Sequence, residues 1–138
     1  MAAAKADEIE AAFLYWREVH QHPRALLTKE RRKAIAERLQ EGYTLVQINA
    51  AIHGILLSPH HIGQNDRQTS YTDIYHVCKS GRMLEKFVYL WERQQARERH
   101  AASSREVAVQ ERVNKMSPEA RAMIEATMAK LKQRGAAH

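Results

Sequence analysis

At 138 residues, with 44% hydrophobic and 28% charged side chains, the chain has the composition of one globular domain with an appendage, not that of a disordered protein. Its 22 Lys and Arg outnumber its 16 Asp and Glu, and the net charge of +6 is compatible with a polyanionic partner without requiring one. No apolar run approaches the roughly 20 residues that a membrane span needs, and a single cysteine, Cys78, excludes an internal disulfide. These features predict a soluble, cytoplasmic protein without a signal peptide.

The first two predicted helices follow from apolar spacing and capping residues. Ile9 and Trp16 lie two helical turns apart, so residues 5–20 are expected to form the first helix. Thr28 is a good N-cap for the second helix, and Gly42 supplies the left-handed residue that ends it. The second helix has a basic face, whose cations are candidates for binding nucleic acid or a partner: Arg31, Arg32, Lys33 and Arg38.

A third helix and a long loop come next. Thr44 and Gln47 match a capping box, and the apolar residues that follow make this third helix the expected centre of the core. Residues 58–69 are rich in turn formers and lack periodicity, so they predict a loop. The loop offers side chains that could hold phosphates or carboxylates, namely His60, His61, Asn65, Asp66 and Arg67. A structural role stays open, in which Asn65 and Asp66 bond the loop's own backbone and Gly63 takes positive φ.

Two further helices complete the expected bundle of about five short helices. Ser70 and Asp73 predict a capping box for a short fourth helix that Gly81 ends. A fifth helix begins near Arg82, and its apolar side chains pack inward as far as Trp91. Further candidate contacts to nucleic acid or a partner lie around these helices: Tyr71, Lys79, Arg82, Lys86, Arg93 and Arg97. Interleaved glutamates leave a solvated, salt-bridged face open as the alternative for each cluster.

Past Trp91 the sequence changes into an extended basic arm, residues 92–138. Residues 91–138 carry ten Lys or Arg and six Glu. Residues 92–115 have helix-forming composition but little apolar stripe, so they form either a projecting helix or a linker. Ser117 and Pro118 then predict the start of an amphipathic helix over 117–134. Its apolar stripe is a candidate surface for a partner or for self-association into a homo-oligomer: Met123, Ile124, Met128 and Leu131.

No pattern points to catalysis, a metal or a cofactor. The sequence has no Ser-His-Asp or Cys-His context and no phosphate-binding glycine loop. A zinc site would have to recruit His60, His61, His76 and Cys78. Adjacent histidines rarely share one metal, and residues two apart on a helix, such as His76 and Cys78, point in different directions. We therefore predict a protein that is not an enzyme and holds no metal.

Five motifs occur in order between residues 27 and 87. They are LT-x-x-x-R-x-x-I-x-x-RL-x-EGYT at 27–44, AI-x-G at 51–54, SP-x-H-x-G-x-N at 58–65, Y-x-D-I at 71–74 and (V/L)E-x-F at 84–87. With these motifs, residues 13–91 resemble the conserved C-terminal domain of phage and prophage replication proteins of the replisome-organiser or helicase-loader type. A more distant likeness to the DnaD-like helical module implies a link of Tyr71 and Ile74 with single-stranded DNA.

The resemblance implies a helical module over residues 1–91, with the arm at 92–138 added to it. It also implies a phage or prophage DNA-replication accessory protein in a bacterial or infected host cell, which binds DNA, the replicative helicase or its loader. Family members usually carry an N-terminal winged-helix domain that recognises an origin. Because this chain begins almost at once with the module, we do not expect sequence-specific origin binding from it.

Two other functions stay open. The first is a small phage-encoded regulator that binds a host or phage machine through its helical arm. The second is a transcriptional regulator, in which residues 44–54 would form half of a helix-turn-helix. That helix is nearly all apolar, however, and lacks the Arg, Asn or Gln array that reads base edges.

Overall fold

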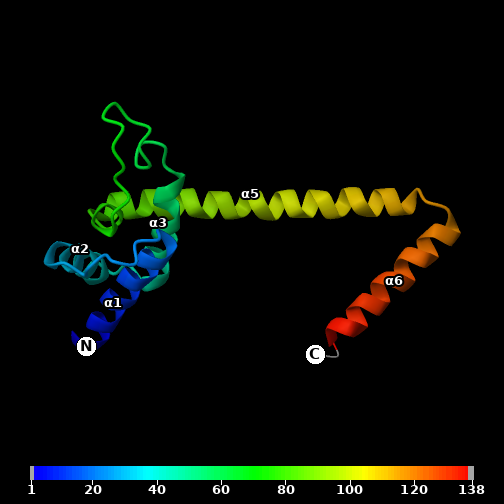
Figure 1. The fold of residues 1–138 in the computed structure, drawn as a ribbon, viewed down its shortest axis with the longest axis horizontal. Coiled ribbons are helices and arrows are strands. Elements are labelled where there is room, and N and C mark those ends of the chain that lie inside the picture. Colours follow the sequence, from blue (N-terminus) through cyan, green and yellow to red (C-terminus); the bar gives the residue numbers. More distant parts are fainter. Residues whose placement is uncertain (1, 137–138) are drawn as a thin grey trace. The chain divides into compact units, whose positions relative to one another are not determined.

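The computed structural model describes residues 2–136, and all regular structure in that range is helical, which confirms the predicted all-α class. The elements in chain order are α1 (Ala2–Val19), α2 (Lys29–Gln40), α3 (Leu45–Gly54), the 3-10 turn η1 (Ile55–Leu57), α4 (Ile74–Val77), α5 (Gly81–Asn114) and α6 (Pro118–Ala136) (Figure 1). None of the helices in the described part of the chain is long and apolar enough to cross a membrane.

The chain divides into two compact units within α5. The first unit ends at Ala96 and contains α1 to α4 with the N-terminal half of α5, and the second begins at Arg97. For residues 92–115 the sequence left a helix or a linker open, and the structure has a helix that continues to Asn114. Pro118 then starts α6, with the Ser117 hydroxyl accepting a hydrogen bond from the Ala120 N–H at 3.3 Å.

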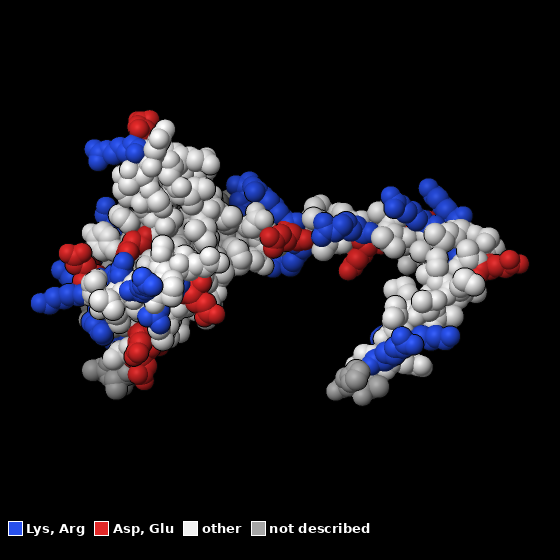
Figure 2. All heavy atoms as spheres, viewed as in Figure 1, with Lys and Arg blue, Asp and Glu red and all other residues white. Residues whose placement is uncertain are grey.

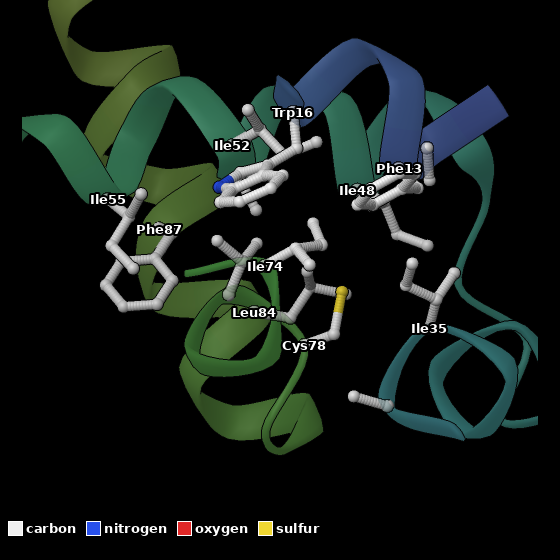
Figure 3. Close-up of a cluster of buried hydrophobic side chains, with 14 of the residues drawn as sticks. Phe13, Trp16, Ile35, Ile48, Ile52, Ile55, Ile74, Cys78, Leu84 and Phe87 are labelled. Carbon is white, nitrogen blue, oxygen red and sulfur yellow. The ribbon is translucent and has the colours of Figure 1, made fainter. Parts of the chain in front are cut away.

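The core of the first unit forms where α1, α2, α3, α4 and the N-terminal half of α5 meet. Trp16 of α1 is 1% exposed, and Ile52 of α3 and Phe87 of α5 are fully buried. Figure 3 shows these side chains around Ile74 and Leu84. Each large apolar side chain buried in this way contributes about 1.5–3 kcal/mol to folding. The third helix and the 3-10 turn after it lie at the centre of the core, as the sequence predicts, because Ile48, Ala51 and Ile52 of α3 and Ile55 of η1 have no exposed surface.

Helix α3 crosses α5 at Gly54. A Cβ at this position would overlap the backbone carbonyl of Phe87, which cannot move aside as a flexible side chain could. Glycine is therefore required for the two backbones to come this close. The crossing explains the glycine of the AI-x-G motif in physical terms.

Two predicted helix starts and one predicted stop are present. The Thr28 hydroxyl accepts from the Arg31 N–H at 3.3 Å at the start of α2. Thr44 and Gln47 form the reciprocal capping box of α3. Gly42 has a φ of 104°, which is the left-handed conformation expected after α2.

The predicted boundaries of the fourth helix are wrong. Its N-cap is Asp73, whose carboxylate accepts from the Tyr75 N–H at 2.9 Å, whereas Ser70 lies within the loop. Gly81 does not end this helix but is the first residue of α5, and the Ser80 hydroxyl caps α5 by accepting from the Met83 N–H at 3.1 Å. Because α4 is a single turn, two helix starts lie within eight residues, and the sequence pattern merges their signals.

Candidate nucleic-acid interface

The loop between η1 and α4 forms one wall of an open groove. The groove has a volume of about 830 Å³, and its lining includes side chains from the loop, from α4 and from the start of α5. We call it the loop groove, and among its lining residues are His60, Asn65, Arg67, Tyr71, His76 and Lys79. Four of the predicted site residues of the loop, His60, His61, Asn65 and Arg67, therefore line one hollow together with Tyr71 and Lys79.

Asn65 holds the loop in shape. Its side-chain amide donates to the carbonyls of His60 and Thr69, both at 2.7 Å, and its side-chain oxygen accepts from the Arg67 and Thr69 N–H groups at 3.1 and 3.2 Å. Gly63 has a φ of 110°, which is the positive φ expected of it if the loop residues have a structural role. The Asn65 side chain is thus used within the loop, and it shapes the loop groove for the side chains around it.

Ser58 and His61 anchor the start of the loop in the core. The Ser58 hydroxyl lies 2.7 Å from Nδ1 of His61, and the His61 ring meets Phe87 edge-on at 5.0 Å. Burial, with smaller effects from the neighbouring positive groups, lowers the pKa of His61, so the ring is neutral at pH 7. Ser58 is only 4% exposed, so a substrate cannot reach its hydroxyl. This Ser–His pair therefore stabilises the loop and is not a catalytic dyad.

Arg31 fixes the other end of the loop. Its guanidinium forms a bidentate pair with the Asp73 carboxylate, with the shortest contact at 2.6 Å, and lies over the Trp16 ring at 5.1 Å. The indole N–H of Trp16 donates to the Thr72 carbonyl at 3.0 Å. Burial works to raise the pKa of Asp73, but hydrogen bonds from Arg31 and the Tyr75 N–H outweigh it and hold that pKa below its usual value. Arg31 therefore positions the loop from within the fold.

The remaining candidates on α2 do not line the loop groove. Arg38 is 6% exposed, and its guanidinium pairs with Glu41 at 3.0 Å and Glu37 at 3.5 Å. Lys33 lies 4.0 Å from the Glu37 carboxylate, and Arg32 is exposed. The acidic neighbours offset the positive charge of Arg38 and Lys33, which corresponds to the salt-bridged face that the sequence left open. We leave Arg38 and Lys33 out of the interface for this reason, and Arg32 because it does not line the loop groove.

Three aromatic rings meet in the loop groove. The rings of His60 and Tyr71 are nearly parallel, with 16° between their planes and 6.0 Å between their centroids. The His76 ring meets Tyr71 edge-on at 5.4 Å. Burial lowers the pKa of His76, the Asp73 charge opposes this effect, and Lys79 adds to it. Flat aromatic rings on an accessible surface are a suitable platform for stacking nucleobases.

A stripe of cations on α5 adjoins the loop groove. Arg82, Lys86, Tyr89 and Arg93 are exposed and follow one another at spacings of four, three and four residues, so they share one face of the helix. We call these four residues the basic stripe. The Arg93 guanidinium lies 5.9 Å from the Tyr89 ring centroid. Lys86 is one of the positive groups that, after burial, lower the pKa of His61, and His61 lines the loop groove.

Figure 2 shows Lys and Arg side chains recurring along α5. Arg97 comes one turn after Arg93 and begins the second unit. Sequence reasoning named the cations of this helix but missed Tyr89, which is 57% exposed. The signal that identifies it is its position between Lys86 and Arg93 at helical spacing.

Metal and nucleophile chemistry find little support in the described residues. No three His, Cys, Asp or Glu side chains among them are placed to hold a metal ion together, although His60, His61 and His76 all line the loop groove. Cys78 is fully buried, and burial raises the pKa of its thiol to about 12. A thiol with this pKa is protonated at neutral pH and is a poor nucleophile.

The predicted apolar stripe of α6 lies in the second unit. Met123 is 73%, Met128 65% and Leu131 60% exposed, and Ile124 is half-buried.

Comparison with models of known families, with curated proteins and with solved structures found no match to this chain. Its function is therefore inferred from the loop groove, the basic stripe and the motifs of the first unit.

Proposed function

We propose that this chain is a non-catalytic DNA-replication accessory protein that binds single-stranded DNA along the loop groove and the basic stripe. The observation that carries the proposal is the continuity of stacking rings and cations, since His60, Tyr71 and His76 lie beside Lys79 and next to α5. The replication setting is supported by the resemblance of residues 13–91 to phage and prophage replication proteins, which also act with the replicative helicase or its loader.

A single strand fits this surface better than a duplex. Bases of a single strand can leave their stack and lie against aromatic rings, and each such contact is worth about 1–3 kcal/mol. The rings of Tyr71 and His76 are half-buried in the groove and that of His60 is exposed, so they offer faces to unstacked bases, whereas the bases of a duplex are already stacked on one another. The phosphates of the same strand can follow the cations of α5, which rise about 1.5 Å per residue along the helix.

The positive charge of the surface comes from Lys and Arg and not from His61 or His76 at neutral pH. Burial lowers the pKa of both His61 and His76 from 6.5, and nearby lysines add to the effect. Lys79, Arg82 and Lys86 therefore make the electrostatic contacts, and the imidazoles supply ring surface. The two kinds of side chain can therefore be tested separately. The cations determine the salt dependence of binding, and the rings contribute to the affinity at a fixed salt concentration.

Fluorescence anisotropy with a labelled oligo(dT) strand, titrated at several NaCl concentrations, tests the proposal. Lys79→Gln, Arg82→Gln and Lys86→Gln should each reduce the slope of log affinity against log salt by about 0.7, because each removes one phosphate contact to a single strand. Tyr71→Leu keeps the backbone and should weaken binding about tenfold while leaving the salt slope unchanged. Lys5→Gln removes one exposed lysine from α1 and serves as the matched control.

The result can contradict the proposal in two ways. If the strand does not bind even at the lowest salt, the DNA-binding function is wrong. If Lys5→Gln reduces the salt slope as much as Lys86→Gln does, the strand binds to the overall positive charge and not to the loop groove. A duplex of the same length, run in parallel, should bind more weakly at every salt concentration.

A further inference from the structure

The second unit contains the C-terminal half of α5 together with α6. None of its described residues from 97 to 135 is buried, and apolar side chains on both helices are largely exposed, including Val109 at 57% and Met128 at 65%. Helices of this length are stabilised in proteins mainly by burying an apolar face, not by their own hydrogen bonds. The unit therefore presents an apolar face that we expect to pack against another protein surface.

A hollow between the two helices defines this face. Its volume is about 630 Å³, and its apolar lining comes from Val109 and Val113 of α5 and Ile124 and Met128 of α6. Ala102 extends the same lining along α5. We call this hollow the arm groove. Ala102, Val109 and Val113 recur at spacings of seven and four residues, so they lie on one face of α5.

The charges at the edge of the arm groove are of both signs. Arg105 and Glu106 border it on α5, and Glu125 borders it on α6. A nucleic acid strand would meet two carboxylates at this edge. A helix of a single charge sign would be repelled on part of the edge. A partner with mixed charges at the same spacing would be attracted on both sides, as in pairs of helices that associate through flanking salt bridges.

We propose that the arm groove is covered by the arm groove of a second copy of this chain. The second copy supplies the same apolar floor and the same mixed edge, so a two-fold arrangement can place Arg105 of each copy near an acidic residue of the other. Two such pairs of helices joined face to face would bury apolar side chains of all four helices against one another. The association does not depend on DNA binding by the first unit.

Sedimentation equilibrium of the full chain over a range of concentrations tests the proposal. Ile124→Glu and Val109→Glu place a charge on the floor of the arm groove, and each should weaken self-association at least about 30-fold, as expected for the centre of an interface. Ala122→Glu and Ala108→Glu introduce the same side chain at exposed positions of the same helices that do not line the groove. These two controls should leave the association unchanged.

The fold of the first unit is followed in the same samples by tryptophan fluorescence, since Trp16 and Trp91 both belong to that unit. A dimer that Ile124→Glu and Val109→Glu dissociate, with unchanged tryptophan emission, supports the proposal. A full chain that stays monomeric at all concentrations overturns it. A dimer that persists in both groove variants also overturns it, because the contact then lies elsewhere.

Discussion

Arg31 and Asp73 connect two motifs that lie 42 residues apart in the sequence. Asp73 does two things at once, because its carboxylate receives the Arg31 guanidinium and also caps α4 through the Tyr75 N–H. The pair closes the loop next to Trp16, and the backbone of Thr72 is held by the indole. Tyr71, which lines the loop groove, is therefore placed by an ion pair that lies outside the groove.

Replacing Asp73 by Asn should separate its two roles. Asn is also a good N-cap, so Asp73→Asn keeps the cap and removes the charge pair. We expect a loss of about 1.5–3 kcal/mol in the free energy of unfolding, the usual value of hydrogen bonds to a charged partner. Arg31→Lys should be intermediate, since it keeps the charge and loses the bidentate geometry. Urea unfolding followed by tryptophan fluorescence measures both.

Arg32→Ala is the control for this comparison, because Arg32 is an exposed neighbour of Arg31 on α2. Its effect on the free energy of unfolding should stay within about 0.5 kcal/mol. An Asp73→Asn variant as stable as Arg32→Ala would contradict the structural role given to the ion pair.

The buried histidines make stability depend on pH. Burial lowers the pKa of His20 and of His61 from 6.5, so between the lowered pKa and 6.5 the unfolded chain binds more protons than the folded one. The contribution of these histidines to the free energy of unfolding should therefore be fully present above pH 6.5 and should be lost as the pH drops below that value. The lowered pKa of Asp73 adds a second loss below its ordinary value of 3.8.

Thermal unfolding followed by circular dichroism at a series of pH values measures this dependence. His20→Gln removes one of the titrating groups and should flatten the decline below pH 6.5. A melting temperature that rises as the pH falls from 6.5 would have the wrong sign and would contradict the burial of these rings.

At the scale of elements, the crossing of α3 and α5 depends on one glycine. Gly54→Ala would force a Cβ onto the Phe87 carbonyl and push the two helices apart. We expect a loss of about 1–3 kcal/mol or more in the free energy of unfolding, the cost of overpacking a core. Gly135→Ala is the matched control in α6, because nothing lies within 4 Å of its added Cβ. Urea unfolding measures both variants. The unfolding midpoint should fall for Gly54→Ala, and for Gly135→Ala it should fall clearly less or rise.

The sequence predicts most elements because their signals are local. Thr28, Gly42 and the Thr44–Gln47 pair act within one helical turn, and the structure has each of them in the expected place. The boundaries around α4 were wrong because this helix is too short to show a period of its own. The Arg31–Asp73 pair could not be predicted, since periodicity carries no information on contacts between distant segments.

The same limit applies to the candidate site. The loop and its polar residues could be predicted from composition, and the structural use of Asn65 was one of the two alternatives. Which side chains face one another is a tertiary property. For that reason the stacking of His60 on Tyr71 and the pairing of Arg38 with Glu41 emerged only from the structure.

At the scale of the whole molecule, the chain joins a unit with its own core to a unit whose described residues, from 97 to 135, include no buried side chain. Truncation after Ala96 should therefore leave the first unit folded, with an unfolding midpoint by tryptophan fluorescence close to that of the full chain. The same truncation should abolish self-association, since the arm groove is removed. If the truncated chain unfolds, the second unit is needed to complete the core of the first.

The central claim is that single-stranded DNA lies in the loop groove, and photo-crosslinking locates the strand directly. An oligonucleotide carrying 5-iododeoxyuridine is bound to the full chain and irradiated, and the crosslinked peptide is identified by mass spectrometry. The account predicts crosslinks to Tyr71, His60 or His76, which are lost when unlabelled strand competes. Crosslinks found only in residues 97–138, or only on α2, would contradict it.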